Sequence, residues 1–255
     1  MNVRVSANAG AFYPAHATAL QVAVRYYSNR CRTSSGLPVA IVAPHAGYGY
    51  CGEQIAAAFS GIQGHTVRKV IHIGPSHYFQ IAGIVQSGAT KFESPFGAVP
   101  VHSISHTLVN TNAEAHRPEH ALEVHLPFLQ YLLAEFVYIP LLVGQCNPED
   151  LADVLQLLEV GSSGVLLVVS SDLSHYLPSA EALNADLKTL HQLERLKSVE
   201  LPQACGAHAL NGAVTLARRN KWGCMAIDRA DSSQFDKTRS DKVVGYGAIA
   251  FYPAL

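Results

Sequence analysis

The stretch IVAPHAGYGYCG, at residues 41–52, is the part of the sequence on which the prediction of the fold and of the functional site depends. An apolar run at residues 39–43 predicts a buried strand, and Pro44 ends it directly before His45. Three glycines follow before residue 53, and they let the backbone pass close to whatever the histidine contacts. We therefore expect a strand that delivers His45 to a functional edge of a sheet.

The same pattern occurs at two further places. The segment VIHIGPSHY, residues 70–78, predicts a strand that breaks at Gly-Pro and then presents His77. The segment VLLVVSSDLSHY, residues 165–176, predicts a third strand followed by Asp172 and His175. In an open α/β sheet, ligands bind at the edge formed by the carboxyl ends of the strands. The three segments therefore predict one site at that edge.

The remaining pattern predicts an α/β fold, with a central, mostly parallel or mixed sheet and helices on both faces. Strands are predicted at residues 39–43, 67–73, 81–86, 136–143, 165–169, 224–229 and 243–251. Helices are predicted at residues 16–29, 53–59, 119–134, 148–159, 179–196 and 204–218. Pro127 should kink the third helix or start a second helical piece, and residues 92–100, with two prolines, should form a functional or covering loop. No linker or repeat divides the chain, so we expect residues 1–255 to form one domain.

The composition excludes several classes of protein. Hydrophobic residues make up 49% of the chain and charged residues 15%, which allows a large core and argues against disorder. The net charge of -1 and the lack of a Lys/Arg cluster argue against nucleic acid as a partner. No apolar run is long enough to span a membrane, and the first residues contain no signal-peptide core. The five cysteines have no C-x-x-C spacing, so we expect reduced thiols and a cytoplasmic location.

His45 and His77 are the strongest candidates for chemistry, because each follows a strand and a turn that contains glycine or proline. One such histidine alone would be an ordinary surface loop residue, but two in the same architectural position favour a function. Asp172 and His175 lie three residues apart, where a shared hydrogen bond would orient the imidazole and raise its basicity. Ordinary turn chemistry explains the same two residues equally well.

Cys205 is a candidate because it lies at the start of a predicted helix, where the helix dipole lowers the pKa of a thiol. A thiolate there would be a nucleophile or a metal ligand, and the alternative is a buried core cysteine. His120, Glu123 and His125 share one helical stretch, but their spacing is not the H-E-x-x-H of a zinc protease. We expect at least one of the two histidines to reach the site from the side, against the alternative of a charged helix surface.

Six ordered motifs resemble those of the Memo family, also described as protein B of the AmmeMemoRadiSam system: PHAGYGYCG, IGPSHY, FESPFGAV, PEHALEVHLPF, SSDLSHY and ACGAHA. The resemblance extends from AGAFYP near the start to VGYGAIAFY near the end, so it covers nearly the whole chain. The family is similar in fold to the LigB-like class III extradiol dioxygenases, which are α/β proteins with a non-haem metal site at the sheet edge. The resemblance therefore implies that fold, and a radical-SAM protein as a partner in the same system.

The resemblance also implies a metal site made of His45, His77 and Cys205. LigB-like enzymes hold Fe(II) with two histidines and a glutamate, and the Memo family has a cysteine in place of the glutamate. Around this pocket, the resemblance implies catalytic roles for His125, Asp172 and His175, with His125 or His175 as a base. The resemblance implies Fe(II), and because a thiolate softens the site, copper or zinc are the alternatives.

Three functions stay open at this point. The first is a metal-dependent redox enzyme that acts on an unknown small molecule. The second is a non-catalytic module that binds a peptide or a small ligand on a dioxygenase-like fold. The third is a metal-free hydrolase or transferase with Cys205 as nucleophile, His175 or His208 as base and Asp172 as orienting group. It ranks last because it gives the two strand-end histidines no role.

Overall fold

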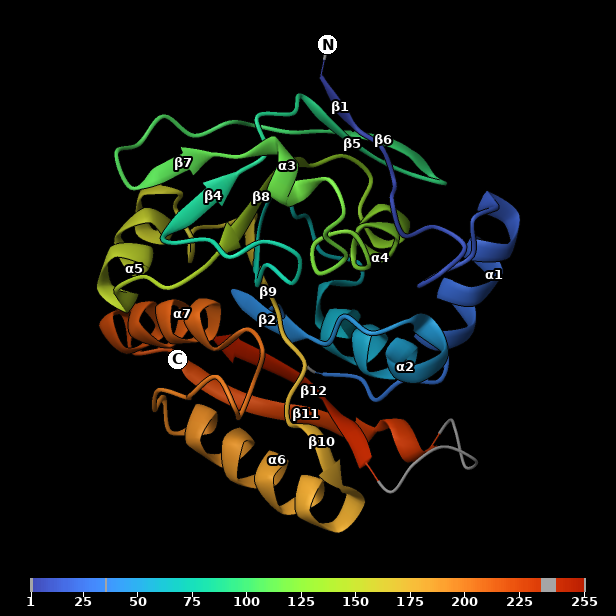
Figure 1. Cartoon of the computed structure of the whole chain (residues 1–255), viewed down its shortest axis with the longest axis vertical. Coiled ribbons are helices and arrows are strands. Elements are labelled where there is room, and N and C mark those ends of the chain that lie inside the picture. The colour runs from blue at the N-terminus through green and yellow to red at the C-terminus, as the bar shows by residue number, and fades with distance from the viewer. Residues whose placement is uncertain (1, 35, 235–241, 255) are drawn as a thin grey trace.

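Three parallel strands form the centre of the main sheet in the computed structural model (Figure 1). The structure describes residues 2–34, 36–234 and 242–254. The central strands are β2 (Ala40–Ala43), β9 (Val165–Ser170) and β3 (Lys69–Gly74), and β9 pairs with both of the others. Apart from the first residue of β3 and of β9, every residue in them is buried. Because parallel neighbours end at the same edge, the three segments singled out in the sequence meet there.

Three strands extend the sheet beyond β3. The strand β8 (Val137–Val143) is parallel to β3, and β4 (Ile84–Gln86) is antiparallel to β8. The strand β7 (Val109–Thr111) ends the sheet on this side, parallel to β4. The mixture of directions agrees with the central mixed sheet predicted from the sequence.

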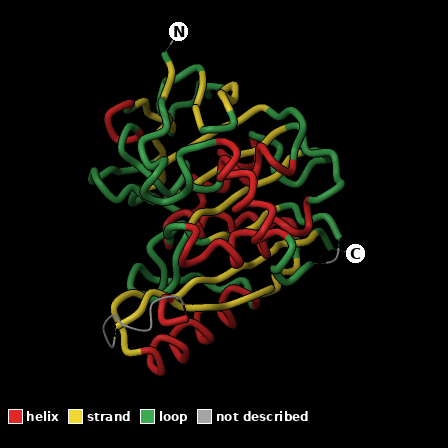
Figure 2. Tube along the Cα trace, turned by 90° about the vertical axis from the view of Figure 1, so that its right-hand side faces the viewer, coloured by secondary structure: helices red, strands yellow, loops and turns green. Residues whose placement is uncertain are grey.

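Beyond β2, the sheet continues with antiparallel strands, which bring it to nine strands in all. The long strand β12 (Lys242–Tyr252) pairs with β2, and both β10 (His175–Pro178) and β11 (Gly223–Asp231) pair with β12. Figure 2 shows β11 and β12 as the long pair in the lower half of the molecule, with the helix α6 (Ser179–Glu194) outside them. The strands predicted at residues 224–229 and 243–251 are confirmed as β11 and β12, and each is longer than predicted.

A separate sheet near the N-terminus contains the three strands β1 (Val3–Arg4), β5 (Lys91–Ser94) and β6 (Gly97–Pro100). The prediction of a covering loop at residues 92–100 is wrong, because this segment belongs to the antiparallel hairpin β5–β6. Pro95 lies in its turn, and Pro100 ends the edge strand, where a missing N–H is tolerated. The two prolines therefore mark a turn and a strand end.

Helices cover both faces of the main sheet, as predicted, because side chains alternate along its strands. In β2, Ala40 and Val42 belong to the core cluster under one group of helices, and Ile41 and Ala43 to the cluster under the other. The first group, at the left and bottom of Figure 1, is α5 (Pro148–Leu157), α6 and α7 (Ala207–Asn220). The second group, at the right, is α1 (Ala17–Ser28), α2 (Tyr48–Phe59) and α4 (Leu126–Leu132). The arrangement is consistent with an α/β dioxygenase-like fold.

Helix α2 begins at Tyr48 rather than at residue 53, so Gly49 and Gly52 lie inside the helix and not in a turn. An added Cβ on Gly52 would lie 2.7 Å from the ring of Tyr27 in α1. Glycine at this position therefore allows α1 and α2 to pack closely. The 3-10 turn Ser60–Ile62 continues α2, and a second 3-10 turn spans Ser232–Gln234.

Residues 119 and 120 have no regular structure and residues 121–125 form consecutive turns, so the helix predicted for residues 119–134 is wrong in its first half. The short helix α3 (Ala113–His116) comes before these turns, and α4 begins only at Leu126. Pro127 lies in the first turn of α4, where its missing N–H costs no hydrogen bond. It therefore starts a helix, which is one of the two outcomes expected for this proline.

A buried ion pair ties these turns to the N-terminal segment. The side chains of Arg4 and Glu123 form the pair and are 6% and 0% exposed. The Arg4 guanidinium also donates hydrogen bonds to the backbone carbonyls of His116 and Glu119, at 3.0 and 2.6 Å. The carboxylate of Glu123 accepts a further hydrogen bond from the backbone N–H of Asn8, at 2.8 Å. These contacts fix the turns where regular helical hydrogen bonds are missing.

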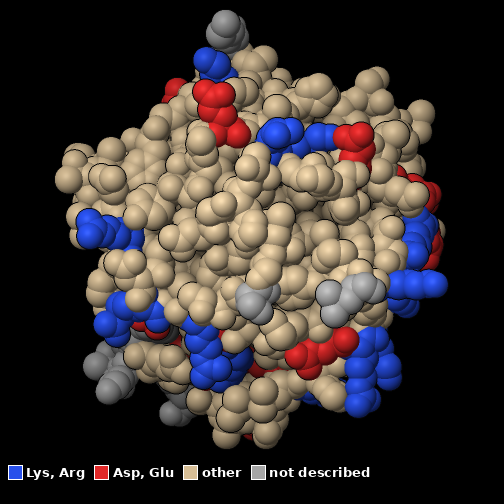
Figure 3. Space-filling model, turned by 180° about the vertical axis from the view of Figure 1, so that it is seen from behind, with Lys and Arg blue, Asp and Glu red and all other residues tan. Residues whose placement is uncertain are grey.

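Charged side chains are sparse on the face seen in Figure 3. They form small groups near the rim, and the middle of the face shows neither sign of charge. This face therefore has no continuous basic surface of the kind that binds a nucleic-acid backbone. Among the residues that the structure describes, no helix has the length and apolar character needed to cross a membrane.

Candidate metal centre

Three side chains from three segments converge at the carboxyl edge of the main sheet. His45 follows β2, His77 follows β3, and Cys205 comes before α7. One donor atom of each lies within 4.8 Å of the donor atoms of the other two. The distance between the Cys205 Sγ and the His45 Nε2 is 3.3 Å. The fold thus brings together the three residues that the resemblance implied as metal ligands.

His45 is 1% exposed, and its hydrogen bonds decide which ring nitrogen carries the proton. The Ser170 hydroxyl donates to the backbone carbonyl of Ala121 at 2.7 Å, so its oxygen accepts from the His45 Nδ1, also at 2.7 Å. A proton on Nδ1 leaves the lone pair of Nε2 free on the side of Cys205. Burial, together with the neighbouring imidazoles, holds the pKa of His45 well below its ordinary value, so the ring is neutral at neutral pH.

His77 is oriented by a carboxylate. The Glu119 Oε1 accepts a hydrogen bond from the His77 Nδ1 at 2.8 Å, and the Oε2 accepts from the His77 backbone N–H at 2.6 Å. Burial alone would raise the pKa of Glu119, but the hydrogen bonds from His77 outweigh it and hold the pKa below its usual value. The Nδ1 N–H faces the carboxylate, and the Nε2 makes no hydrogen bond within the described residues, as in the carboxylate–histidine pairs of metal sites.

Cys205 directly precedes Gly206, the N-cap of α7. The sequence predicted that the helix dipole would lower the pKa of this thiol, and that prediction is wrong. Burial and the nearby Asp172 carboxylate raise the pKa of Cys205 to about 12, even though the Asp172 backbone N–H donates to Sγ at 3.2 Å. The cost of burying a thiolate outweighs the dipole here.

Asp172 contributes a carboxyl group from the loop after β9. Its Oδ1 accepts a hydrogen bond from the His45 backbone N–H at 2.8 Å, and its Oδ2 lies 3.9 Å from the His45 Nε2. Burial raises the pKa of Asp172 to about 7, although the hydrogen bond from His45 opposes the shift. The carboxyl group can therefore hold or release a proton near neutral pH beside the thiol of Cys205.

The hydrogen bond predicted between Asp172 and His175 is not formed in the described part of the chain. The His175 Nδ1 donates instead to the backbone carbonyl of Leu173 at 2.8 Å, and His175 is the first residue of β10. His175 is partly buried and near enough to contribute to the lowered pKa of His45. Its Nε2 has no hydrogen bond within the described residues, and its role as a catalytic residue stays a prediction.

His125 lies beneath the site and is fully buried. Its Nε2 donates to the backbone carbonyl of Pro44 at 2.7 Å, and its Nδ1 lies 3.0 Å from the His72 Nε2. The other nitrogen of His72 lies 2.7 Å from the hydroxyl of Tyr138. Both ring nitrogens of His125 are therefore occupied, which does not favour the role of a base. Its contact with Pro44 holds the backbone directly before His45.

His120 reaches the site from the side, as expected for one of the two histidines in its segment. Its ring stacks on His77 at a centroid distance of 4.4 Å and on Phe12 at 4.6 Å, and it meets His45 edge-on at 5.3 Å. Burial lowers the pKa of His120 to about 4, and its shielded Nδ1 has no hydrogen-bond partner among the described residues. Glu119, His77 and His120 also form a second group of close donor atoms, but both Glu119 oxygens already accept from His77.

Sequence reasoning missed Glu119 and Ser170, the two residues that set the protonation of the histidines. Ser170 is the last residue of β9, so the strand-end rule that singled out His45 and His77 could have found it. No such signal marks Glu119, because it lies in turns that have no hydrophobic period.

The protonation states distinguish a metal site from a thiol nucleophile. A catalytic thiol–imidazole pair needs a thiolate, but burial raises the pKa of Cys205 and lowers that of its contacting imidazole, His45. The hypothesis of a nucleophile had given the role of base to His175 or His208 instead. A metal cation would displace the thiol proton and accept both imidazole lone pairs. Two imidazoles and one sulfur fit a transition metal.

Comparison with known proteins identifies the family. A family model described as Memo-like protein matches residues 4–250. A MEMO1 family protein of Aquifex aeolicus is 33% identical over 79% of this chain and 78% of its own length. MEMO1 family proteins of Thermoplasma volcanium and Archaeoglobus fulgidus are 28% and 29% identical, over 97% and 95% of this chain and 97% of their own lengths. The family match includes every segment that supplies the site, and the chain belongs to the family of Memo-like proteins.

Proposed function

We propose that this protein is a metal-dependent redox enzyme in which His45, His77 and Cys205 bind one transition-metal ion. The observation that carries the proposal is the convergence of their three donor atoms within 4.8 Å. The hydrogen bonds that engage the Nδ1 of each histidine, and so leave each Nε2 available to a metal, support it. Iron is the proposed metal, with copper or zinc as alternatives, because imidazole and thiolate ligands suit all three.

When bound, iron or copper would supply one-electron chemistry and a position for oxygen. The chain itself would hold protons close to that position. Asp172, whose pKa is about 7, and the free Nε2 of His175 are the proposed proton carriers, and the Nδ1 of His120, 3.4 Å from the Glu119 Oε1, is a third. His125 is proposed to act through the carbonyl that precedes His45, as a positioning residue.

A second candidate function is a binding module that uses the same edge without turnover. The observation that favours it is the exposure of the residues after His77: Tyr78 and Phe79 expose 54% and 41% of their surface. Exposed aromatic side chains beside a site offer contact area to a peptide or a small molecule. A radical-SAM partner and a cytoplasmic location stay predictions from the sequence.

The experiment is metal analysis by mass spectrometry of protein purified without air and without an affinity-tag metal. We expect about one metal ion per chain in the wild type, and a loss of about tenfold or more in Cys205→Ser and His77→Ala. Cys224→Ser removes a thiol from β11 and His102→Ala removes an exposed imidazole, so both should keep the metal. Equal metal content in all five proteins would contradict the site.

Turnover separates the two candidates once the metal is established. Oxygen consumption by the metal-loaded wild type, with candidate small molecules, is expected for a redox enzyme. Ligand binding without oxygen consumption or product, across a broad set of compounds, would favour the binding module.

A further inference from the structure

A cavity of about 530 Å³ lies at the same edge of the sheet and has Cys205 in its wall. It is bounded by the loop after β3, the end of β8 and the segment before α7. Its apolar wall is formed chiefly by Phe79, Ile81, Val143 and Leu201. A cavity of this volume suits a small molecule.

Four polar side chains line this cavity and have no hydrogen bond of their own within the described residues: Ser76, Gln80, Gln145 and His208. The Ser76 Oγ is also shielded from solvent. A shielded hydroxyl without a hydrogen-bond partner is destabilising. A molecule that supplies hydrogen-bond partners would remove this cost, so the polar part of the wall is complementary to a ligand with hydroxyl or amide groups.

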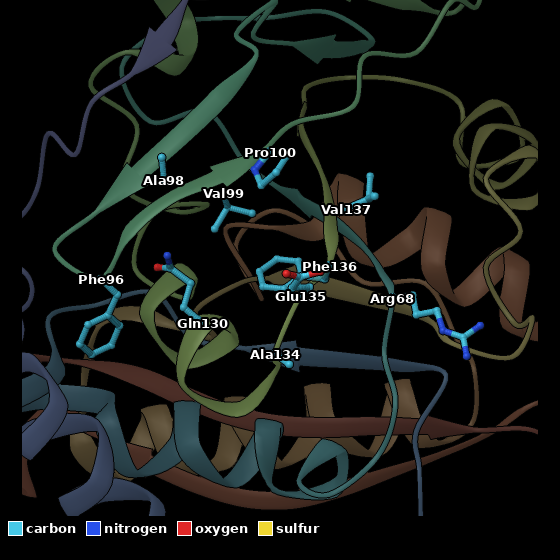
Figure 4. A pocket seen from close by; sticks show the side chains of 10 residues that line it. All are labelled: Arg68, Phe96, Ala98, Val99, Pro100, Gln130, Ala134, Glu135, Phe136 and Val137. Atoms are coloured by element: carbon cyan, nitrogen blue, oxygen red, sulfur yellow. The ribbon is translucent and has the colours of Figure 1, made fainter.

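Charge distinguishes this cavity from a larger one elsewhere on the molecule. Among the described residues, no Lys, Arg, Asp or Glu lines the cavity beside Cys205. The larger cavity, of about 740 Å³, lies against α4 and β6 and has Arg68 and Glu135 in its wall (Figure 4). In the protein without metal, a charged ligand in this cavity would lose hydration without gaining an opposite charge from the wall, which is costly. The cavity therefore favours an uncharged molecule.

The wall of the cavity is preformed by two loops that hydrogen-bond to each other. The Gly83 N–H donates to the carbonyl of Gln145, and the Gly144 N–H donates to the carbonyl of Gly83, both at 2.9 Å. An added Cβ on Gly144 would lie 2.0 Å from the carbonyl oxygen of Ile81, so glycine is needed for this contact. A preformed wall loses little conformational entropy when a ligand binds.

We propose that the cavity beside Cys205 binds an uncharged small molecule, about the size of one substituted ring, whose hydroxyl or amide groups bond to Ser76 and its polar neighbours. The apolar side chains cover the ring. The identification of this molecule as a substrate rests on the proposed function, because Cys205 belongs both to the cavity wall and to the metal centre. Binding of the molecule to the cavity does not require the metal.

The test uses three probes that share one ring: benzamide, which is neutral, benzoate, which is an anion, and benzylamine, which is a cation at neutral pH. Each is titrated into the full-length ¹⁵N-labelled protein, and the amide signals of Gly144 and Leu201 are followed. Benzamide is expected to shift both signals in a saturable way and to bind about tenfold more tightly than either charged probe.

Variants locate the binding. Ser76→Ala is expected to weaken benzamide binding about fivefold. Ala82→Phe, which places a ring in the cavity, is expected to abolish it. Ser162→Ala removes an exposed hydroxyl elsewhere and should bind like the wild type. Amide signals far from the cavity should be unchanged in all three variants, which shows that each is folded.

Three results would overturn the proposal: no saturable shift with benzamide, a charged probe that binds as tightly as benzamide, or wild-type affinity in both cavity variants. Metal analysis of the same samples separates this proposal from the proposed function. Benzamide binding by protein that takes up no metal would keep the cavity and remove the metal centre. Metal uptake without benzamide binding would keep the metal centre and remove the proposed ligand site in the cavity.

Discussion

The two histidines of the proposed metal centre donate hydrogen bonds to chemically different partners. His45 donates to the neutral hydroxyl of Ser170, and His77 donates to the ionised carboxylate of Glu119. A carboxylate raises the basicity of an imidazole that binds a metal. Glu119 should therefore contribute directly to metal affinity, although it is not itself proposed as a ligand.

Glu119→Gln is expected to weaken Zn²⁺ binding about 10- to 100-fold. The amide carries no charge, and its single oxygen cannot replace both carboxylate oxygens that accept from His77. The measurement is competition with a chelator of known affinity. Glu114→Gln is the matched control, because Glu114 is exposed and its ion pair within the described residues is with Arg117. Equal affinities in the two variants would show that Glu119 does not act on the metal through His77.

At the residue scale, the sequence could predict which side chains supply the donor atoms, but it could not predict the pKa of Cys205 or the hydrogen bond of His175. Strand ends pointed to His45 and His77, and the fold brings both to one edge. The helix dipole at Cys205 could be inferred from sequence, but the desolvation that raises its pKa depends on every residue packed around the sulfur. The hydrogen bond predicted for Asp172 and His175 failed for a related reason, since a backbone carbonyl competes for the imidazole.

At the scale of elements, the N-terminal segment holds the turns that carry Glu119 and His120. The ion pair between Arg4 and Glu123 is nearly inaccessible to solvent. Removing one partner of a buried pair leaves the other charge buried and uncompensated. The turns have few regular hydrogen bonds of their own, so they depend on this contact.

Arg4→Ala is therefore expected to lower the free energy of unfolding by about 3–5 kcal/mol. The measurement is urea unfolding followed by circular dichroism. Arg117→Ala is the control, because the exposed pair of Arg117 with Glu114 should contribute at most about 1 kcal/mol. Similar, small losses in both variants would mean that the N-terminal segment does not clamp the turns.

Regular elements could be predicted where hydrophobic periodicity was strong. The strands β2, β3, β8 and β9 and the helices α1, α5 and α6 lie close to their predicted positions. The predictions failed at residues 92–100 and 119–125, where the structure depends on contacts distant in sequence. The first segment pairs with the N-terminal strand β1, and the second is held by Arg4. Neither contact produces a pattern in the local sequence from which it could be predicted.

At the scale of the whole molecule, buried histidines make stability depend on pH. Burial lowers the pKa of His116 and of His125 to about 4, whereas the unfolded chain has ordinary values near 6.5. Between these values the unfolded chain binds more protons than the folded chain. The free energy of unfolding should therefore decrease as the pH falls from about 6.5 to about 4, by about 2–3 kcal/mol for each histidine.

Urea unfolding at about pH 7 and about pH 4.5 measures this loss. His116→Gln should reduce it, because the variant lacks one titrating group while the amide can still donate to the carbonyl of Val85. His102→Gln, at an exposed position, should leave the loss unchanged. A pH dependence that is the same in all three proteins would contradict the contribution of His116.

The overall topology could be predicted only as a class. The sequence predicted a mixed sheet with helices on both faces, and the structure confirms it. The sequence did not predict that β9 lies between β2 and β3, because strand order is set by packing over the whole chain. This order places the end of β9 beside β2, so that Ser170 and Asp172 both hydrogen-bond to His45. It is the reason why the loop after β9 contributes to the proposed metal centre.

The central claim is that Cys205 and two histidines bind one metal ion, and X-ray absorption at the zinc edge of Zn²⁺-loaded protein tests it most directly. The account predicts one sulfur neighbour at about 2.3 Å and nitrogen neighbours at about 2.0–2.1 Å. The sulfur should be lost in Cys205→Ser and kept in Cys224→Ser. A wild-type spectrum with only nitrogen and oxygen neighbours would contradict the account.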